Sequence, residues 1–269
     1  MVESKRERVN NLIKEKGFLW TVSYIFNSQV KEKISDKYAL WINKKQLDAK
    51  DEKSFIDLPS HTVEENKRLW NNYDWSEEGE EWTSEVQKYK GIDPNQWKKQ
   101  LINDLMIKNF TANKTILEIG PGAGRWTEHL RKIGKRVILA DITKKCLDVC
   151  QERFKDDNKI EYHLIENNLD FLPENSIDQI WSYDVFVHIN PSDIKKYIKE
   201  FQRVLKPGGI AIIHHSGMIS DYIDKKEGWR SFMGKNQFSK ILEDNNLKII
   251  SQNEDLVHLK GDIVSIFSK

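Results

Sequence analysis

The stretch that decides the fold is Ile116-Leu-Glu-Ile-Gly-Pro-Gly-Ala-Gly-Arg-Trp-Thr127. In it a short apolar run ends at Gly120, glycines recur at Gly122 and Gly124, and a helical pattern follows. Glycine lets the backbone turn sharply and approach a ligand closely, and the first turn of a helix offers free N–H donors. The segment therefore predicts a strand, a ligand-binding turn and a helix, in that order.

Two other glycine-rich motifs do not fit this turn. The dinucleotide fingerprint G-x-G-x-x-G, started at Gly120, needs a glycine where the chain has Arg125, and started at Gly122 it meets Thr127. A P-loop ends in G-K-[ST], which this segment lacks. Glu118, two residues before the first glycine, is badly placed for a pyrophosphate and suits a ligand with an ammonium or sulfonium charge.

Beyond this turn, apolar runs alternate with helical patterns. The expected strands are 115–120, 136–142, 160–165, 177–183, 208–215, 247–251 and 262–267, and the expected helices are 125–133, 144–154, 194–205 and 238–244. Strands separated by helices predict an α/β fold with a doubly wound, mostly parallel seven-stranded sheet. The last two strands have no helix between them, which favours an antiparallel hairpin at the sheet edge.

Asp141 is the second informative residue. It ends the second strand, 17 residues after Gly124. A carboxylate there can accept hydrogen bonds from both hydroxyls of a ribose. The alternative is a helix-capping or surface aspartate, but its place beside the glycine turn favours the ribose role.

Four segments resemble those of the class I S-adenosylmethionine-dependent methyltransferases, in the same order and spacing. They are ILEIGPGAG, LADIT, the stretch 172–189 and the stretch 204–210. The resemblance covers about residues 113–269. It implies a Rossmann-like methyltransferase fold, methyl-transfer activity and S-adenosylmethionine as cofactor.

The resemblance also implies which residues bind the cofactor. Glu118 and the backbone of 120–124 would hold its methionine part, Asp141 its ribose, and Ile142 would pack on the adenine. The family often has an aspartate after the third strand, facing the adenine amino group. Here that region reads Glu-Asn-Asn, and a glutamate carboxylate or an asparagine amide can take that role, with Asn167 and Asn168 as the expected residues.

Asp184 follows the fourth strand and is expected to border the transferred methyl group. An alcohol acceptor needs a general base, for which a neutral histidine is the usual choice. His188, His214 and His215 fall at the carboxyl ends of the fourth and fifth strands, where ligands of such sheets bind. Neighbouring strand residues point to opposite faces, so only one of the latter pair can face the cleft.

We therefore expect His188, or failing that His215, to be the general base, with His214 in substrate binding. Trp229 and Arg230 are further substrate-binding candidates, because an arginine can hold an anionic or hydroxyl-rich group. The alternative for Arg230 is a surface ion pair.

A narrower resemblance concerns the acceptor. The runs SYDVFVHI, LKPGG, IAIIHHSG and GWRSFM, with the lead-in LWNNYDWSEEGEEW, are similar to methyltransferases encoded with sugar and surface-glycan pathways. This implies O-methylation of a hydroxyl of a sugar or glycan precursor. Two alternatives stay open: N-methylation of a small amine, which needs no strong base, and a non-catalytic cofactor-binding or scaffold protein.

The chain changes character near residue 113. We expect a helical N-terminal extension over 1–62, a Trp-rich helical cap over 63–112 and the Rossmann-like domain over 113–269. The cap segment carries Trp70, Trp75, Trp82 and Trp97 among acidic residues. Aromatic residues interleaved in a polar segment predict packing against a larger body or the lining of a ligand pocket.

Composition excludes several classes. The 269 residues include 43 Lys and Arg against 42 Asp and Glu, a net charge of +1, which disfavours a nucleic-acid partner. The N-terminus has no apolar segment typical of a signal peptide, and no stretch is long enough to span a bilayer. We therefore expect a cytoplasmic protein with a small-molecule or carbohydrate acceptor, and leave open whether it forms a homo-oligomer.

The two cysteines, Cys146 and Cys150, exclude a disulfide scaffold and are expected to face the core of a helix. Asp184, His188 and His215 are of suitable type for a divalent metal, but such a trio arises easily by chance. We expect no metal.

Overall fold

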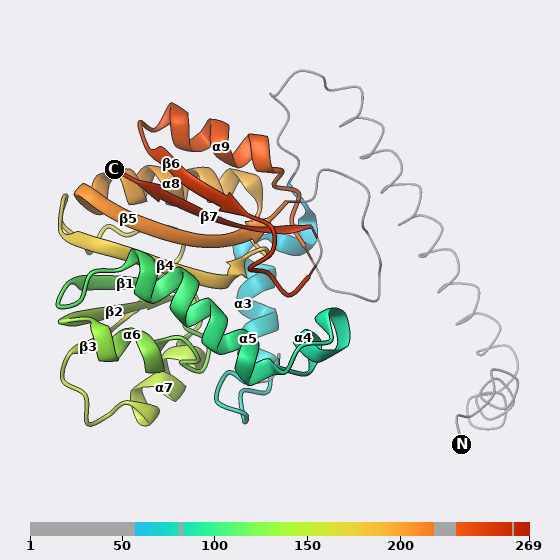
Figure 1. Cartoon of the computed structure of the whole chain (residues 1–269). Coiled ribbons are helices and arrows are strands. Elements are labelled where there is room, and N and C mark those ends of the chain that lie inside the picture. The colour runs from blue at the N-terminus through green and yellow to red at the C-terminus, as the bar shows by residue number, and fades with distance from the viewer. Residues whose placement is uncertain (1–56, 81–82, 218–229, 260) are drawn as a thin grey trace, which may run out of the picture. The chain divides into compact units, whose positions relative to one another are not determined.

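The computed structural model describes residues 57–80, 83–217, 230–259 and 261–269, all within one compact unit, Glu52–Lys269. Its strands form one sheet in the order β3-β2-β1-β4-β5-β7-β6 (Figure 1). The strands are β1 (Thr115–Ile119), β2 (Arg136–Asp141), β3 (Ile160–Leu164), β4 (Ile177–Phe186), β5 (Leu205–Ser216), β6 (Lys248–Asn253) and β7 (Asp262–Ser268). The helices are η1 (Pro59–His61), α3 (Val63–Asn72), α4 (Thr83–Lys90), α5 (Pro94–Leu101), η2 (Ile102–Ile107), α6 (Thr127–Ile133), α7 (Lys144–Arg153), α8 (Pro191–Val204) and α9 (Lys235–Asp244).

The sheet is mixed. β1 to β5 pair in parallel, whereas β7 runs antiparallel to both β5 and β6. Among the described residues the seven-stranded, mostly parallel sheet is therefore confirmed, and so is the antiparallel hairpin at its edge. No helix in these residues is long and apolar enough to cross a membrane.

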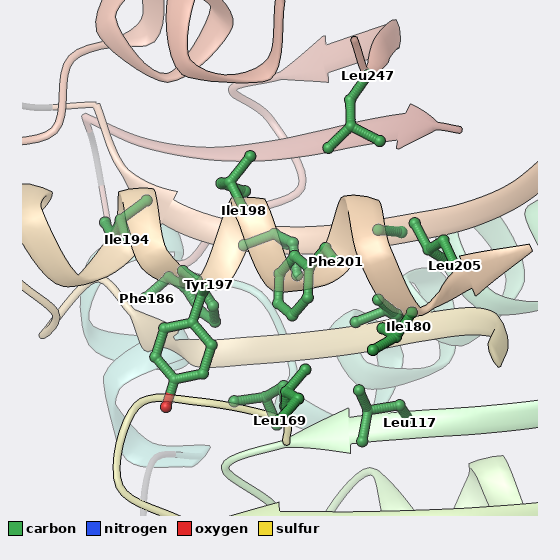
Figure 2. Packing of buried hydrophobic residues seen from close by; sticks show 14 of the residues in the cluster. Leu117, Leu169, Ile180, Phe186, Ile194, Tyr197, Ile198, Phe201, Leu205 and Leu247 are labelled. Carbon is green, nitrogen blue, oxygen red and sulfur yellow. The ribbon is translucent and has the colours of Figure 1, made fainter. Parts of the chain in front are cut away.

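Helices α8 and α9 cover one face of the sheet. Ile194, Tyr197, Ile198 and Phe201 recur at helical spacing along α8, and each is at most 2% exposed. They pack against strand residues such as Ile180, as Figure 2 shows. Apolar residues that recur every three or four positions give a helix one face to bury, which fixes α8 on the sheet.

Helices α5, α6 and α7, with η2, cover the opposite face. Trp97 on α5 is buried against Trp126 and Tyr183, with ring centroids 6.5 and 6.0 Å away. The Trp-rich segment thus contributes to the core of the sheet domain. Most of the expected N-terminal extension, together with Trp82, lies outside the described residues.

Strand β4 is longer than expected, because it continues beyond Tyr183 to Phe186. Its register against β5 shifts between Ser182 and Phe186, which marks a bulge. A bulge bends a strand and re-aims its side chains without ending it. The sequence pattern shows the apolar run but not this irregularity.

Gly120, directly after β1, has no room for a side chain. Its φ is +69°, and a Cβ there would lie 2.5 Å from Cγ2 of Val185. The loop after β1 can therefore approach the end of β4 only because this residue is glycine.

We expect Gly120→Ala to lower the free energy of unfolding by about 2–4 kcal/mol, because left-handed strain adds to overpacking against Val185. Gly208→Ala is the matched control: its φ is +76° but no atom lies within 4 Å of the added Cβ. It should cost about 1 kcal/mol. Urea denaturation measures both, and equal losses would refute the close approach as the cause.

Candidate active site

A cavity that is partly open to solvent lies at the carboxyl ends of β1 to β4. The carboxyl ends of parallel strands meet at one edge of the sheet, which is where such folds bind ligands. Asn66 and Trp70 of α3, together with Trp75, line the cavity from the cap segment. The structure thus brings the Trp-rich segment to the edge that carries the glycine turn.

The glycine loop, residues 120–124, forms one wall of this cavity. The amide of Gly120 donates to the carbonyl of Ala140 on β2 at 2.8 Å, which ties the loop to the neighbouring strand. Gly122 has a φ of +56°, and a Cβ there would lie 2.9 Å from the indole of Trp75. The loop is therefore packed closely against the indole of the cap at Gly122.

Glu118 is not among the residues that line the cavity. Its side chain is 1% exposed, and Oε2 accepts a hydrogen bond from the hydroxyl of Thr127 at 2.6 Å, while Oε1 has no partner in the part of the chain that the structure describes. Burial raises the pKa of Glu118 to about 8 despite the bond from Thr127. The carboxyl group is therefore protonated in the free protein at neutral pH.

Asp141 ends β2 and lines the cavity with Ile142, as the sequence predicts. Its Oδ1 accepts hydrogen bonds from the amide and the hydroxyl of Thr143, both at 2.8 Å. Burial raises the pKa of Asp141 to about 6, although Thr143 and the backbone N–H of Gly122 favour the charged form. The bonds from Thr143 fix the carboxylate in place while one face of the residue meets the cavity.

The segment after β3 corrects one expectation. Ile165 and Glu166 line the cavity, whereas Asn167 and Asn168 do not. Nδ2 of Asn167 donates to Asp193 at 3.0 Å, and Asn168 is exposed. The two asparagines thus lie one and two residues beyond Glu166, the last residue of this segment that lines the cavity.

Asp184 lies in the β4 bulge and lines the cavity. Its φ is +62°, a conformation that few residues other than glycine adopt and that often marks a functional position. Burial alone would raise the pKa of Asp184, but His258 and His214 hold it well below its usual range. The cavity wall therefore contains a carboxylate that stays charged.

His188 also lines the cavity, in the turn that follows β4. Its amide donates to the carbonyl of Val185, and its own carbonyl accepts from Nδ2 of Asn66 at 3.0 Å. Its ring centroid lies 5.2 Å from that of Trp70. Helix α3 thus holds His188 from the cap side, and the ring adjoins the space beside Asp184.

A buried ionic network supports Asp184 from behind. It consists of Glu85, Asp184, His214, Arg230, His258 and Asp262. His214 lies between two carboxylates, 3.2 Å from Asp184 and 3.4 Å from Asp262. Burial lowers the pKa of His214, but the two carboxylates outweigh it and raise the pKa. Arg230 pairs with Asp262 at 3.0 Å, which balances the second carboxylate.

His215 does not face the cavity. Its Nδ1 lies 2.7 Å from the carbonyl of Ser216, its Nε2 lies 2.7 Å from the hydroxyl of Ser265, and its ring stacks on Phe238. Burial lowers the pKa of His215 to about 3. Both ring nitrogens are engaged on the α9 side of the sheet, so His215 cannot take a proton from an acceptor in the cavity. The expectation that His215 could serve as the general base is therefore wrong.

Two of the expected substrate-binding residues, His214 and Arg230, do not line the cavity, because they belong to the buried ionic network. The third, Trp229, lies outside the described residues. Cys146 and Cys150 are buried on α7, where Cys150 donates to the carbonyl of Gly122 at 3.2 Å and Cys146 lines the cavity. Among the described residues no group of His, Cys, Asp and Glu is arranged to hold a metal.

Three charged residues of the site were missed from sequence. Asp262 and His258 lie in or beside the edge hairpin, far along the chain from Asp184, and no local pattern links them. Arg125 lines the cavity immediately after the glycine loop. Its position directly after Gly124 could have indicated a binding residue, but Arg125 was used only to exclude the dinucleotide fingerprint.

Comparison with known proteins agrees with this geometry. Residues 117–213 match the family model described as "Methyltransferase domain". A demethylmenaquinone methyltransferase from Tropheryma whipplei (strain Twist) is 33% identical over 38% of this chain and 42% of its own length. A phosphoethanolamine N-methyltransferase from Plasmodium falciparum (isolate 3D7) is 27% identical over 49% of this chain and 47% of its own. The chain spans less than half the length of these two curated relatives.

A solved structure shares the fold. The geranyl diphosphate C-methyltransferase from Streptomyces coelicolor A3(2), in complex with Mg²⁺, geranyl diphosphate and S-adenosyl-L-homocysteine, aligns with a TM-score of 0.56 at 15% identity. The alignment covers 78% of this chain and 98% of that one. The chain contains a class I S-adenosylmethionine-dependent methyltransferase domain.

The methyltransferase domain should lose stability as pH rises. The unfolded chain releases the Glu118 proton near its usual pKa of 4.5, whereas the folded domain keeps it until about pH 8. The folded state binds more protons in this window, so the free energy of unfolding falls with rising pH. In Glu118→Gln, the decrease in the free energy of unfolding between pH 5 and 8 should be smaller than in the parent protein by at least about 1 kcal/mol.

Urea denaturation between pH 5 and 8 measures the effect. Glu174→Gln, at an exposed position, is the control and should keep the slope of the parent protein. A Glu118→Gln profile parallel to the parent's would contradict a neutral carboxyl at this position.

Proposed function

We propose that this chain transfers a methyl group from S-adenosylmethionine to a hydroxyl group of a small acceptor, with His188 as the general base. The observation that carries the proposal is one cavity whose lining includes both the glycine loop with Asp141 and the pair Asp184 and His188. The first pair suits a nucleoside cofactor, and the second suits an acceptor that must lose a proton.

The residues present fit the cofactor. Gly120 and Gly122 line the cavity without side chains, and Asp141 offers carboxylate oxygens to two ribose hydroxyls. Ile142 and Ile165 provide apolar contacts for the adenine, and Glu166 can accept from its amino group. Glu118 does not line the cavity, but a cationic cofactor group bound near the glycine loop would favour the ionised form of its buried carboxyl.

The bound cofactor supplies a methyl group on a sulfonium, which is already an activated leaving group. The protein then has to align the acceptor, exclude water and take up the acceptor's proton. Trp70 and Trp75 exclude water from the cap side. His188 would accept the proton as the bond between the hydroxyl oxygen and the methyl carbon forms, and Asp184 would orient the acceptor.

Substitution of His188 tests this role. With a hydroxyl acceptor, His188→Gln should lower kcat by about 10²–10⁴-fold while the affinity for S-adenosylhomocysteine stays unchanged. His215→Gln is the matched control, because that ring is buried but does not reach the cavity. Its kcat should stay within about threefold, measured per folded molecule by labelled methyl transfer. Comparable losses in both variants would refute His188 as the base.

A second candidate is N-methylation of a small amine. Asp184 favours it, because a buried carboxylate that stays charged, in a cavity also lined by the aromatic rings of Trp70 and Trp75, attracts an ammonium group. The relative named as a phosphoethanolamine N-methyltransferase is consistent with it. If the methylated group is a hydroxyl, we propose a sugar or surface-glycan precursor as the acceptor, as the sequence resemblance implies.

Asp184→Asn separates the two candidates. An amine acceptor would lose the charge that binds it, so its KM should rise about tenfold or more, and its turnover would survive His188→Gln within about threefold. A hydroxyl acceptor would instead lose turnover mainly in His188→Gln. A panel of small amines, hydroquinones and nucleotide sugars decides between these patterns.

A further inference from the structure

Arg125, in the wall of the cavity, has donors that no hydrogen bond satisfies among the described residues. Its side chain is 5% exposed, and its Nε and Nη2 are buried without a hydrogen-bond partner among the described residues. Burying a donor without a partner lowers the stability of the folded state, because the donor loses its hydrogen bonds to water and gains none in the protein. A buried arginine of this kind is explained if a ligand completes its bonds.

The surroundings of Arg125 fix the orientation of its guanidinium. Cζ lies 5.5 Å from the ring centroid of Trp97 and 5.0 Å from that of Trp126, so aromatic rings hold the group. A Cβ on Gly79 would lie 2.8 Å from Cβ of Arg125, so the cap backbone closes over the stem. The group is held in place by packing and not by hydrogen bonds.

The nearby carboxylate does not satisfy it. Oε2 of Glu80 lies 3.8 Å from Nε of Arg125, beyond hydrogen-bond distance, and Oε1 of Glu80 accepts from Lys98. The other carboxylates in the cavity wall are Asp141, Glu166, Asp184 and Asp193. Among the described lining residues Arg125 is the only arginine or lysine, so an anionic group entering the cavity has this one strong cationic partner.

We infer that Arg125 binds an oxyanion, a carboxylate or a phosphate, on a ligand in this cavity. A guanidinium matches the two oxygens of such a group with parallel N–H bonds. Two ligands can carry the oxyanion: the cofactor, through the carboxylate of its methionine part, or the acceptor. The first source rests on the proposed function, and Arg125 follows the loop at which that part of the cofactor would lie.

Calorimetry with two cofactor-related ligands distinguishes the sources. S-adenosylhomocysteine has the carboxylate, whereas 5′-methylthioadenosine has the same nucleoside and sulfur without the amino acid. If the oxyanion is the cofactor's, Arg125→Met should raise the Kd of S-adenosylhomocysteine about 10–100-fold and leave that of methylthioadenosine within about twofold.

If the oxyanion belongs to the acceptor, both nucleosides should bind the variant normally. Inorganic phosphate should then stabilise the parent protein against heat more than chloride does at equal ionic strength, and Arg125→Met should abolish that difference. A variant that keeps both its affinity for S-adenosylhomocysteine and its response to phosphate would overturn the inference.

Two further variants keep the test decisive. Arg131→Met is the matched control: Arg131 lies on α6, does not line the cavity, and its guanidinium already pairs with Glu128 and Asp157. It should not change either ligand response, and a loss equal to that of Arg125→Met would overturn the inference. Arg125→Lys keeps the charge but loses the paired donors, and should show an intermediate affinity if Arg125→Met does not fold.

If the parent protein binds neither nucleoside, the proposed function fails, and the phosphate measurement alone then decides the role of Arg125.

Discussion

The absence of space beside Gly120 is the constraint on which the site depends. The loop after β1 touches Val185 at the end of β4, and the same loop touches the indole of Trp75 at Gly122. These two contacts close the cavity from the sheet side and from the cap side. A side chain at either glycine would separate the surfaces that must meet around a ligand.

The cavity that results is electrically uneven. The buried carboxyl of Glu118 lies near the glycine loop and Asp141 lies in the cavity wall, both with pKa values raised by burial. Asp184, also in the wall, has a pKa lowered by His258 and His214. The first two groups can therefore gain negative charge when a cation binds, whereas Asp184 is charged at all times. This difference suits a cationic cofactor beside the glycine loop and Asp141, and an acceptor that Asp184 orients.

The sequence predicts those parts of the site that are local. Gly120, Gly122 and Asp141 follow apolar strands, and parallel strands bring such ends together, so their convergence was predictable. His188 was predictable for the same reason. The bulge that directs Asp184 into the cavity was not, because it depends on the register between β4 and β5.

Long-range partners explain the remaining differences. His215 was a reasonable base from its position, but Ser265 of β7 and Phe238 of α9 engage its ring from elements that follow much later in the chain. The buried ionic network likewise joins residues separated by up to about 180 positions, from Glu85 to Asp262. Hydrophobic periodicity identifies elements and their buried faces, and it gives no information on which polar groups meet between them.

The central claim is that the glycine loop and Asp141 bind the nucleoside of S-adenosylmethionine. The most direct measurement is the affinity of Asp141→Asn for S-adenosylhomocysteine, since asparagine keeps an oxygen for Thr143 but loses the charge that faces the ribose. Calorimetry should show a Kd raised about tenfold or more, because charged hydrogen bonds contribute about 1.5–3 kcal/mol each. An unchanged Kd in a folded variant would contradict the account.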